Sequence, residues 1–215
     1  GNSRVGVRNS APQSALDVVG PIASRMGTNG ALTMGVLEIT ANTISGSGLK
    51  IITNIPWSGG STHAHTVTIR GFAYDSARVA DLQIAWHKYN NSFYNRTATS
   101  SGSWAPTVTL AVESDKVVIH LSSPGYWPKL YVESLYNAYG DPSHAQGWTW
   151  ADAAISADAN TPNETVAYKT DLGNGFKVDG SGTIINDNSL DSDFRVESNL
   201  RDHMLFVDGG NNAVG

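Results

Sequence analysis

Pairs of apolar residues separated by a single residue recur along this chain, and short clusters of Gly, Asn, Asp and Ser separate one pair from the next. Leu37 with Ile39 and Phe194 with Val196 are examples. Alternate residues of an extended strand point to the same side, so each pair predicts one apolar strand face, and the clusters between pairs predict tight turns. Charged residues make up only 15% of the chain, and 22 residues are Gly. This composition favours turns and strands over helices, and the sequence therefore predicts an all-β protein.

Residues 49–150 differ from both flanks, because their strands are longer and they contain all six Trp residues. Five or more alternating strands joined by turns predict one antiparallel β-sandwich or jelly-roll domain. In the strand that begins at His63, the alternation places Val67 and Ile69 on the inner side. The residues that we expect in the core include Val67, Ile69, Ile84, Trp86, Leu110 and Ile119.

The flanks, residues 1–48 and 151–215, contain mostly isolated apolar pairs. A two-residue apolar face buries about 100–200 Å², or about 3–5 kcal/mol, which does not offset the entropy lost in ordering the surrounding turns. Three chains wound about a common axis would create the core that one chain lacks. We therefore expect short-strand stalk segments of a homotrimer on both sides of the sandwich. Their inward residues would be Leu16, Val18, Leu37, Ile39, Phe176, Val178, Phe194, Val196, Leu205 and Val207.

The opening GNSRVGVRNSAPQSALDV resembles the Gly-Asn repeat of tailed-bacteriophage tail fibre proteins, and the closing DFRVESNLRDHMLFVDGGNNAVG resembles the segment that commonly precedes it. The middle, with HTVTIRGFAYDS and YWPKLYVESLYNAYG, is similar to a β-domain inserted in fibres of phages, notably marine ones. The resemblance implies an elongated homotrimer on the virion, extracellular once released, joined to other fibre segments and recognising the host surface. The alternative is a fragment of a bacterial trimeric surface adhesin, because Gly-Asn turns occur there too.

Several functions are not expected. Fourteen Lys and Arg against nineteen Asp and Glu give a net charge of −5, which repels nucleic acid and anionic membrane surfaces. The apolar runs are too short for membrane insertion. A glycosidase would need two carboxylates facing one another across a cleft, and the acidic residues lie instead near predicted turns and strand edges. Those residues are Asp81, Glu113, Asp115, Glu133, Asp141 and Asp152. We predict no enzymatic activity.

Aromatic residues supply the best candidates for a binding site. Trp and Tyr stack on the apolar faces of sugar rings, and neighbouring polar groups satisfy the hydroxyls, so exposed aromatic residues predict contacts with a host-surface glycan. The simpler interpretation is that Trp residues fill the sandwich core, and we expect this of Trp86, Trp104, Trp127 and Trp148. The surface candidates for ligand binding are Tyr94, Tyr126, Tyr139 and Trp150.

His63 and His65 form the one candidate metal site. Two His at alternate positions of a strand project to the same side, and three chains would offer six imidazoles to a transition metal. The motif begins a strand of the globular domain, however, and the same face becomes apolar at Val67. Ordinary surface or partly buried His residues are the expected outcome, and we predict no cofactor.

Overall fold

The computed structural model describes residues 5–11, 13–14, 16–25, 30–58, 63–74, 78–138, 141–156, 162–169, 176–179, 182–185, 194–198, 201–208 and 213–214. The chain divides into two compact units, Gly1–Ala167 and Tyr168–Gly215. The first unit contains the sandwich.

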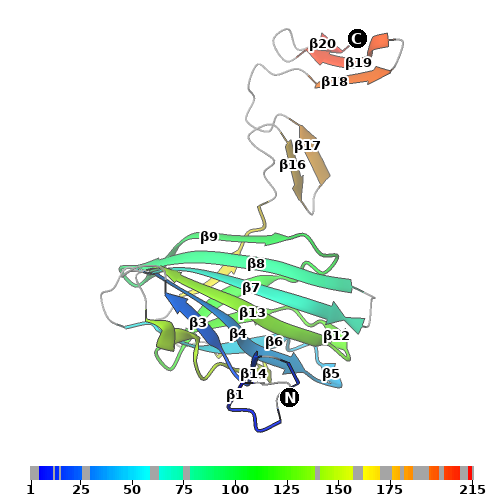
Figure 1. Cartoon of the computed structure of the whole chain (residues 1–215). Coiled ribbons are helices and arrows are strands. Elements are labelled where there is room, and N and C mark those ends of the chain that lie inside the picture. Colours follow the sequence, from blue (N-terminus) through cyan, green and yellow to red (C-terminus); the bar gives the residue numbers. More distant parts are fainter. Residues whose placement is uncertain are drawn as a thin grey trace. The chain divides into compact units, whose positions relative to one another are not determined.

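Two antiparallel sheets form the sandwich, one layer behind the other (Figure 1). The six-stranded sheet has the order β3 (Ile22–Arg25), β4 (Gly30–Thr40), β13 (Lys129–Ala138), β7 (His63–Ala73), β8 (Arg78–Tyr89) and β9 (Ser92–Ser100). The five-stranded sheet has the order β14 (Thr149–Asp152), β6 (Leu49–Pro56), β11 (Lys116–Leu121), β10 (Val108–Glu113) and β15 (Asn163–Val166). Neighbouring strands run antiparallel in both. The predicted all-β class and central antiparallel sandwich are confirmed.

The core follows the alternation in the sequence. All six residues named above as expected core residues are no more than 2% exposed. Two-residue hairpin loops help to fix these registers. Asn90 and Asn91 join β8 to β9 with φ of 46° and 54°, and Ser114 and Asp115 join β10 to β11 with φ of 48° and 60°. Positive φ at both loop residues is the mark of the type I′ turn, whose twist matches that of the flanking strands.

The N-terminal boundary of the sandwich differs from the sequence-based prediction. Strand β4, which we assigned to a stalk within residues 1–48, lies inside the six-stranded sheet between β3 and β13. Ile39 is completely buried in its own chain, so the expectation that it faces a three-fold axis is wrong. Eleven residues paired on both edges form far more hydrogen bonds than an isolated stalk strand. On the C-terminal side, β15 also joins the sandwich rather than a stalk.

Smaller elements complete the described residues. In the first unit, β1 (Val5–Val7) pairs with β2 (Leu16–Val18), β5 (Thr43–Ile44) pairs with β12 (Gly125–Tyr126), and η2 (Pro142–Ala145) is a 3-10 helix. Leu16 is exposed, and Val18 is partly exposed. No helix among the described residues is long and apolar enough to cross a bilayer.

The second unit contains a hairpin and a three-stranded sheet. The hairpin pairs β16 (Phe176–Asp179) with β17 (Gly182–Ile185). The sheet contains β18 (Phe194–Ser198), β19 (Arg201–Asp208) and β20 (Ala213–Val214). The predicted apolar pairs of this region therefore lie in strands. The orientation of their side chains toward a three-fold axis stays a prediction, because those side chains lie outside the described part of the chain.

A matched pair on β8 tests the assignment of strand faces. Ile84 is fully buried and Val79 is 55% exposed. Ile84→Ala should lower the free energy of unfolding by about 2–5 kcal/mol through lost burial and the remaining cavity. Val79→Ala should change it by about 0.5 kcal/mol or less. Urea denaturation followed by Trp fluorescence measures both, and equal losses would contradict the faces assigned here.

Candidate functional site

Four aromatic side chains gather at one end of the six-stranded sheet. This aromatic cluster comprises Phe72, Tyr74, Tyr126 and Trp127. The ring centroid of Tyr74 lies 5.9 Å from that of Tyr126, 5.6 Å from that of Trp127 and 6.3 Å from that of Phe72, all in edge-to-face geometry. Each side chain is exposed, at 39–53%. Exposed Leu or Tyr residues are ordinary when isolated, but a contiguous set of large rings marks a site of interaction.

A close approach of β7 to β13 positions Phe72 in the cluster. Gly71 has a φ of +138°, and a Cβ at this position would lie 2.1 Å from the carbonyl oxygen of Lys129. Only glycine fits there. The next residue, Phe72, pairs with Lys129 on β13 and with Val79 on β8. Ile69 and Ala73 point into the core, and Phe72 lies at the alternate position of β7, so its ring points to the outer face.

Trp127 is held in an unusual backbone conformation. Its φ is 50°, in the left-handed region that bulky residues rarely adopt. Its backbone N–H donates a 2.7 Å hydrogen bond to the carbonyl oxygen of Asn42. The ammonium of Lys129 lies 4.9 Å from the centroid of the indole ring, a cation–π contact. The surrounding structure thus fixes both the backbone and the exposed ring of Trp127, and such local strain is commonly found at functional sites.

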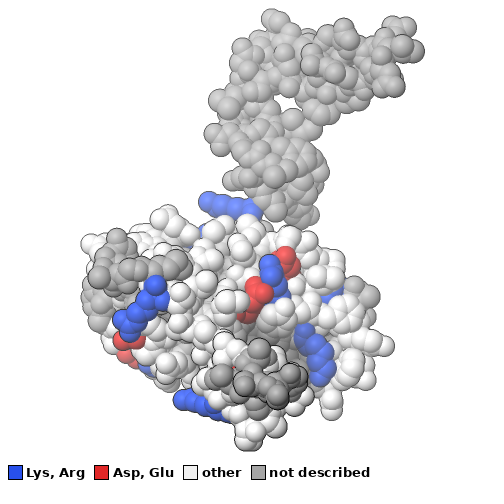
Figure 2. All heavy atoms as spheres, viewed as in Figure 1, with Lys and Arg blue, Asp and Glu red and all other residues white. Residues whose placement is uncertain are grey.

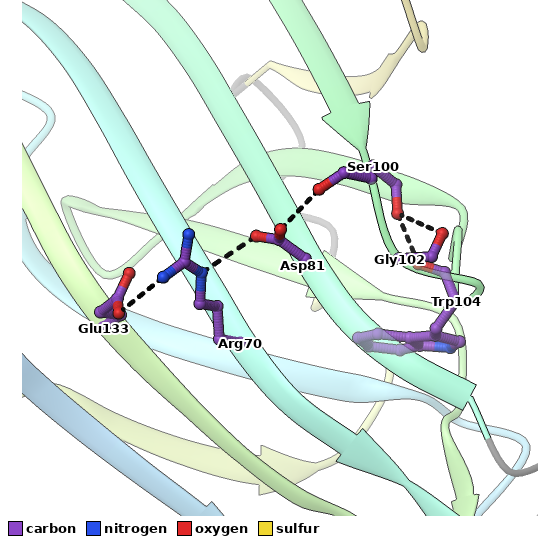
Figure 3. A network of polar contacts seen from close by, with 7 residues as sticks. Arg70, Asp81, Ser100, Gly102, Trp104 and Glu133 are labelled. Carbon is purple, nitrogen blue, oxygen red and sulfur yellow. Dashed lines mark hydrogen bonds and ion pairs between the residues drawn. The ribbon is translucent and has the colours of Figure 1, made fainter.

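A row of three charged side chains lies next to the aromatic cluster on the same face. This charged row runs across three adjacent strands, from Glu133 on β13 through Arg70 on β7 to Asp81 on β8 (Figure 3). Arg70 Nη1 lies 3.0 Å from Glu133 Oε1, and Arg70 Nε lies 3.1 Å from Asp81 Oδ1. Arg70 is two residues before Phe72, so both side chains occupy the outer face about 7 Å apart along β7.

The contacts of the charged row favour the ionised forms of Asp81 and Arg70. The pKa of Asp81 lies below its ordinary value, first because the Ser101 hydroxyl donates a hydrogen bond to it and then because of Arg70. The pKa of Arg70 is raised, chiefly by the hydrogen bond to Asp81 and by the charge of Glu133. The Arg70 guanidinium has five N–H donors, and only its Nε and Nη1 atoms contact the two carboxylates. Donors and carboxylate acceptors thus remain available to hydroxyl groups of a ligand.

The structure brings one of the four predicted ligand residues into this site. Tyr126 belongs to the aromatic cluster. Tyr94 lies elsewhere, with its ring centroid 6.5 Å from that of His87, and Trp150 is half-buried on β14 of the other sheet. Tyr139 lies outside the described residues. Phe72 and Tyr74 were not among the predicted ligand residues, although both lie at the end of a strand with a clear alternation in the sequence.

Trp127 was assigned to the core, and that prediction is wrong, because its ring is 43% exposed. The other three Trp residues expected in the core, Trp86, Trp104 and Trp148, are buried as predicted. Trp104 is also labelled in Figure 3, where it follows the short turn that leads out of β9 alongside Asp81.

His63 and His65 project to the same side of β7, as predicted, but that side is the interior of the sandwich. His65 is 1% exposed and stacks on Trp86 with ring centroids 5.1 Å apart. The ring of His63 lies 5.9 Å from that of His65 and 5.6 Å from that of His144, which follows Ser143 in η2. Burial within one chain removes both rings from any axis shared by three chains. Among the described residues, no group of three or more His, Asp or Glu is arranged to hold a metal ion.

No family model, no curated protein and no solved structure matches this chain. The chemistry of the site is therefore inferred from its own geometry. That geometry is a set of exposed rings beside a charged row, on the outer face of the six-stranded sheet.

The buried His65 makes the sandwich sensitive to acid. Burial lowers the pKa of His65 from 6.5 to about 3, and the neighbouring His63, His144, Lys88 and His87 contribute in the same direction. Neither ring nitrogen of His65 has a hydrogen-bond partner among the described residues. The unfolded chain therefore binds a proton that the folded chain excludes between about pH 6.5 and pH 3, so stability falls as the pH falls through that window.

Replacing His65 with Phe should remove part of this acid sensitivity. Wild-type protein should lose up to about 3–5 kcal/mol of unfolding free energy between pH 7 and pH 3 through this group. His65→Phe keeps the ring stacked on Trp86 and should flatten the pH profile. Urea denaturation at a series of pH values measures the difference. The pKa of His144 is also lowered by burial, so some acid sensitivity should remain. Identical profiles for the two proteins would contradict the assignment to His65.

Proposed function

We propose that this chain is a structural module of a trimeric bacteriophage tail fibre, and that its sandwich binds a glycan of the host cell surface. The observation that supports glycan binding is the aromatic cluster beside the charged row. Rings of Tyr and Trp stack on the apolar face of a sugar, and Arg70, Asp81 and Glu133 offer hydrogen bonds to its hydroxyls. Binding sites for small ligands commonly combine apolar walls with a few fixed polar groups in this way.

The cost of presenting the rings to water supports the same proposal. Burying one aromatic side chain is worth about 1.5–3 kcal/mol, and the chain leaves four such side chains exposed at one place. Trp127 also adopts a left-handed backbone conformation, which costs free energy and is fixed by the bond to Asn42. A ligand that covers these rings would recover part of both costs.

The proposal assigns a binding role, not a catalytic one, to the two carboxylates. A glycosidase needs one carboxyl group that holds a proton at its working pH. Asp81 and Glu133 share the positive charge of Arg70, and the pKa of Asp81 is lowered rather than raised. A carboxylate with a lowered pKa, such as Asp81, accepts hydrogen bonds from hydroxyls but is a poor general acid.

The assignment to a trimeric fibre on the virion rests on the resemblance of both ends of the chain to fibre repeats. The second unit adds a physical argument, because its described residues form a two-stranded hairpin and a small three-stranded sheet. An isolated two-stranded hairpin is at best marginally stable in water. Partner chains, or adjoining fibre segments, would supply the missing apolar contacts.

Trp127→Ala tests glycan binding. Removing the ring should weaken binding about ten- to thirtyfold, because covering one large aromatic ring is worth about 1.5–2 kcal/mol. The measurement is an array of bacterial surface polysaccharides followed by calorimetric titration of those that bind. Trp150→Ala, in the five-stranded sheet, is the control and should bind as wild type does. If Trp150→Ala weakens binding and Trp127→Ala does not, the proposed site is contradicted and the glycan binds at β14 instead.

The oligomeric state tests the fibre assignment. Light scattering should give a mass three times that of the 22.8 kDa chain. Phe194→Asp should weaken the trimer, because three carboxylates would meet in an apolar core. Tyr94→Asp, on the sandwich surface, should leave the mass unchanged. A wild-type mass of one chain would contradict the trimer.

A further inference from the structure

A second group of rings, two of them exposed, lies on the β8–β9 hairpin. This hairpin cluster comprises His87, Tyr89 and Tyr94. The ring centroids of His87 and Tyr89 are 6.2 Å apart with nearly parallel planes, and that of Tyr94 lies 6.5 Å from His87 and 6.3 Å from Tyr89. Tyr89 is 54% exposed and Tyr94 is 43% exposed. A β-bulge between Ala85 and His87 adjusts the register so that His87 opposes Tyr94.

The aromatic cluster and the hairpin cluster lie on the same face of the six-stranded sheet. Along β8, Leu82, Ile84 and Trp86 point into the core. The alternate residues therefore point outward, from Val79, the partner of Phe72, to Tyr89 in the hairpin cluster. The ten-residue rise from Val79 to Tyr89 separates the two ends by about 33 Å.

The surface between the two clusters carries charged and uncharged polar groups together with the exposed rings of Tyr131 and Tyr136 on β13. The charged row lies next to the aromatic cluster, and Gln83 and Thr99 follow it as an exposed cross-strand pair. Thr97 and Thr66 flank Ala85 on the neighbouring strands and are half-buried. Figure 2 shows the molecule in the same view as Figure 1, with the six-stranded sheet toward the viewer. In this view, uncharged residues cover most of the described surface.

We propose that the outer face of the six-stranded sheet binds a linear polysaccharide along β8, with one ring cluster under each end of the bound segment. This inference rests on the proposed glycan binding and names its ligand as an extended chain rather than a single terminal sugar. The rings stack on sugar units at the two ends. The hydroxyl, amide and charged groups between them form hydrogen bonds to the hydroxyls of the intervening units.

The order of polar and apolar groups favours a polysaccharide over a protein partner. Protein–protein interfaces have a desolvated, apolar centre and a polar rim. This face has no such apolar centre, because the exposed rings of Tyr131 and Tyr136 on β13 lie among polar groups between the two clusters. A sugar chain alternates apolar ring faces with hydroxyl groups, so it can use both kinds of surface along its length.

Two ring clusters that bind the same polysaccharide chain would act together. Once one end is bound, the other end is at high local concentration, and linked binding of this kind can exceed either single affinity by about 10²–10⁴. Short fragments cannot span both clusters. The affinity should therefore rise steeply with ligand length, and removal of either cluster should abolish that rise.

The experiment uses the 215-residue chain and bacterial surface polysaccharides selected on an array, together with their acid-hydrolysis fragments. Calorimetric titration compares wild type with Trp127→Ala, the double variant Tyr89→Ala/Tyr94→Ala, and Trp150→Ala as the control. Each of the first two variants should lose about tenfold or more in affinity for the long polysaccharide. With di- and trisaccharides, each of these two variants should lose binding at its own ring cluster and keep binding at the other cluster. Thermal melts establish that all variants are folded.

Three outcomes would overturn the inference. If the Tyr89/Tyr94 variant binds long polysaccharide as wild type does while Trp127→Ala is impaired, only the aromatic cluster binds and the proposed function stands without the extended site. If wild type binds no polysaccharide on the array, both proposals fail. If the Tyr89/Tyr94 variant changes the oligomeric mass, the hairpin cluster is a contact between copies of the chain.

Discussion

The pairing of β7 with β13 on one edge and β8 on the other determines the chemistry of both faces of the large sheet. Side chains alternate between the two faces of a strand. A shift of the pairing register by one residue would therefore expose Val67 and Ile69 to solvent and bury Arg70 and Phe72. Burial of an arginine without its carboxylate partners costs far more than the rings would gain. The apolar core therefore fixes the register, and the outward position of the aromatic cluster and the charged row follows from it.

The sequence predicted those parts of the fold that depend on local alternation. The core residues of β7, β8, β10 and β11 followed directly from their spacing. Strand β4 did not, because Gly35, with a φ of 68°, and the bulge opposite Val132 and Ser134 interrupt its alternation. Its place in the sheet also depends on pairing with β13, nearly one hundred residues later. Such long-range pairing leaves little mark on a short apolar segment, and a stalk was the expectation instead.

The candidate site was harder to predict than the fold for a related reason. Phe72, Tyr74, Tyr126 and Trp127 come from two segments that meet only because β7 and β13 are neighbours. Trp127 looks like a core residue from its type alone. Its exposure depends on the left-handed backbone conformation and on the hydrogen bond to Asn42, and neither can be predicted from the sequence pattern. The inward direction of His63 and His65 was predictable, but their burial depends on packing with residues such as His144 from another segment.

The two faces of β7 respond differently to acid. On the inner face, His65 must stay neutral for the sheet to form, because burial opposes its charge. On the outer face, Arg70 is always charged, and Asp81 stays ionised to a lower pH than an ordinary carboxyl group. Mild acid therefore weakens the scaffold before it changes the charges of the row formed by Arg70 and Asp81. Any loss of binding below neutral pH would then begin in the core, on the face of β7 that the ligand never touches.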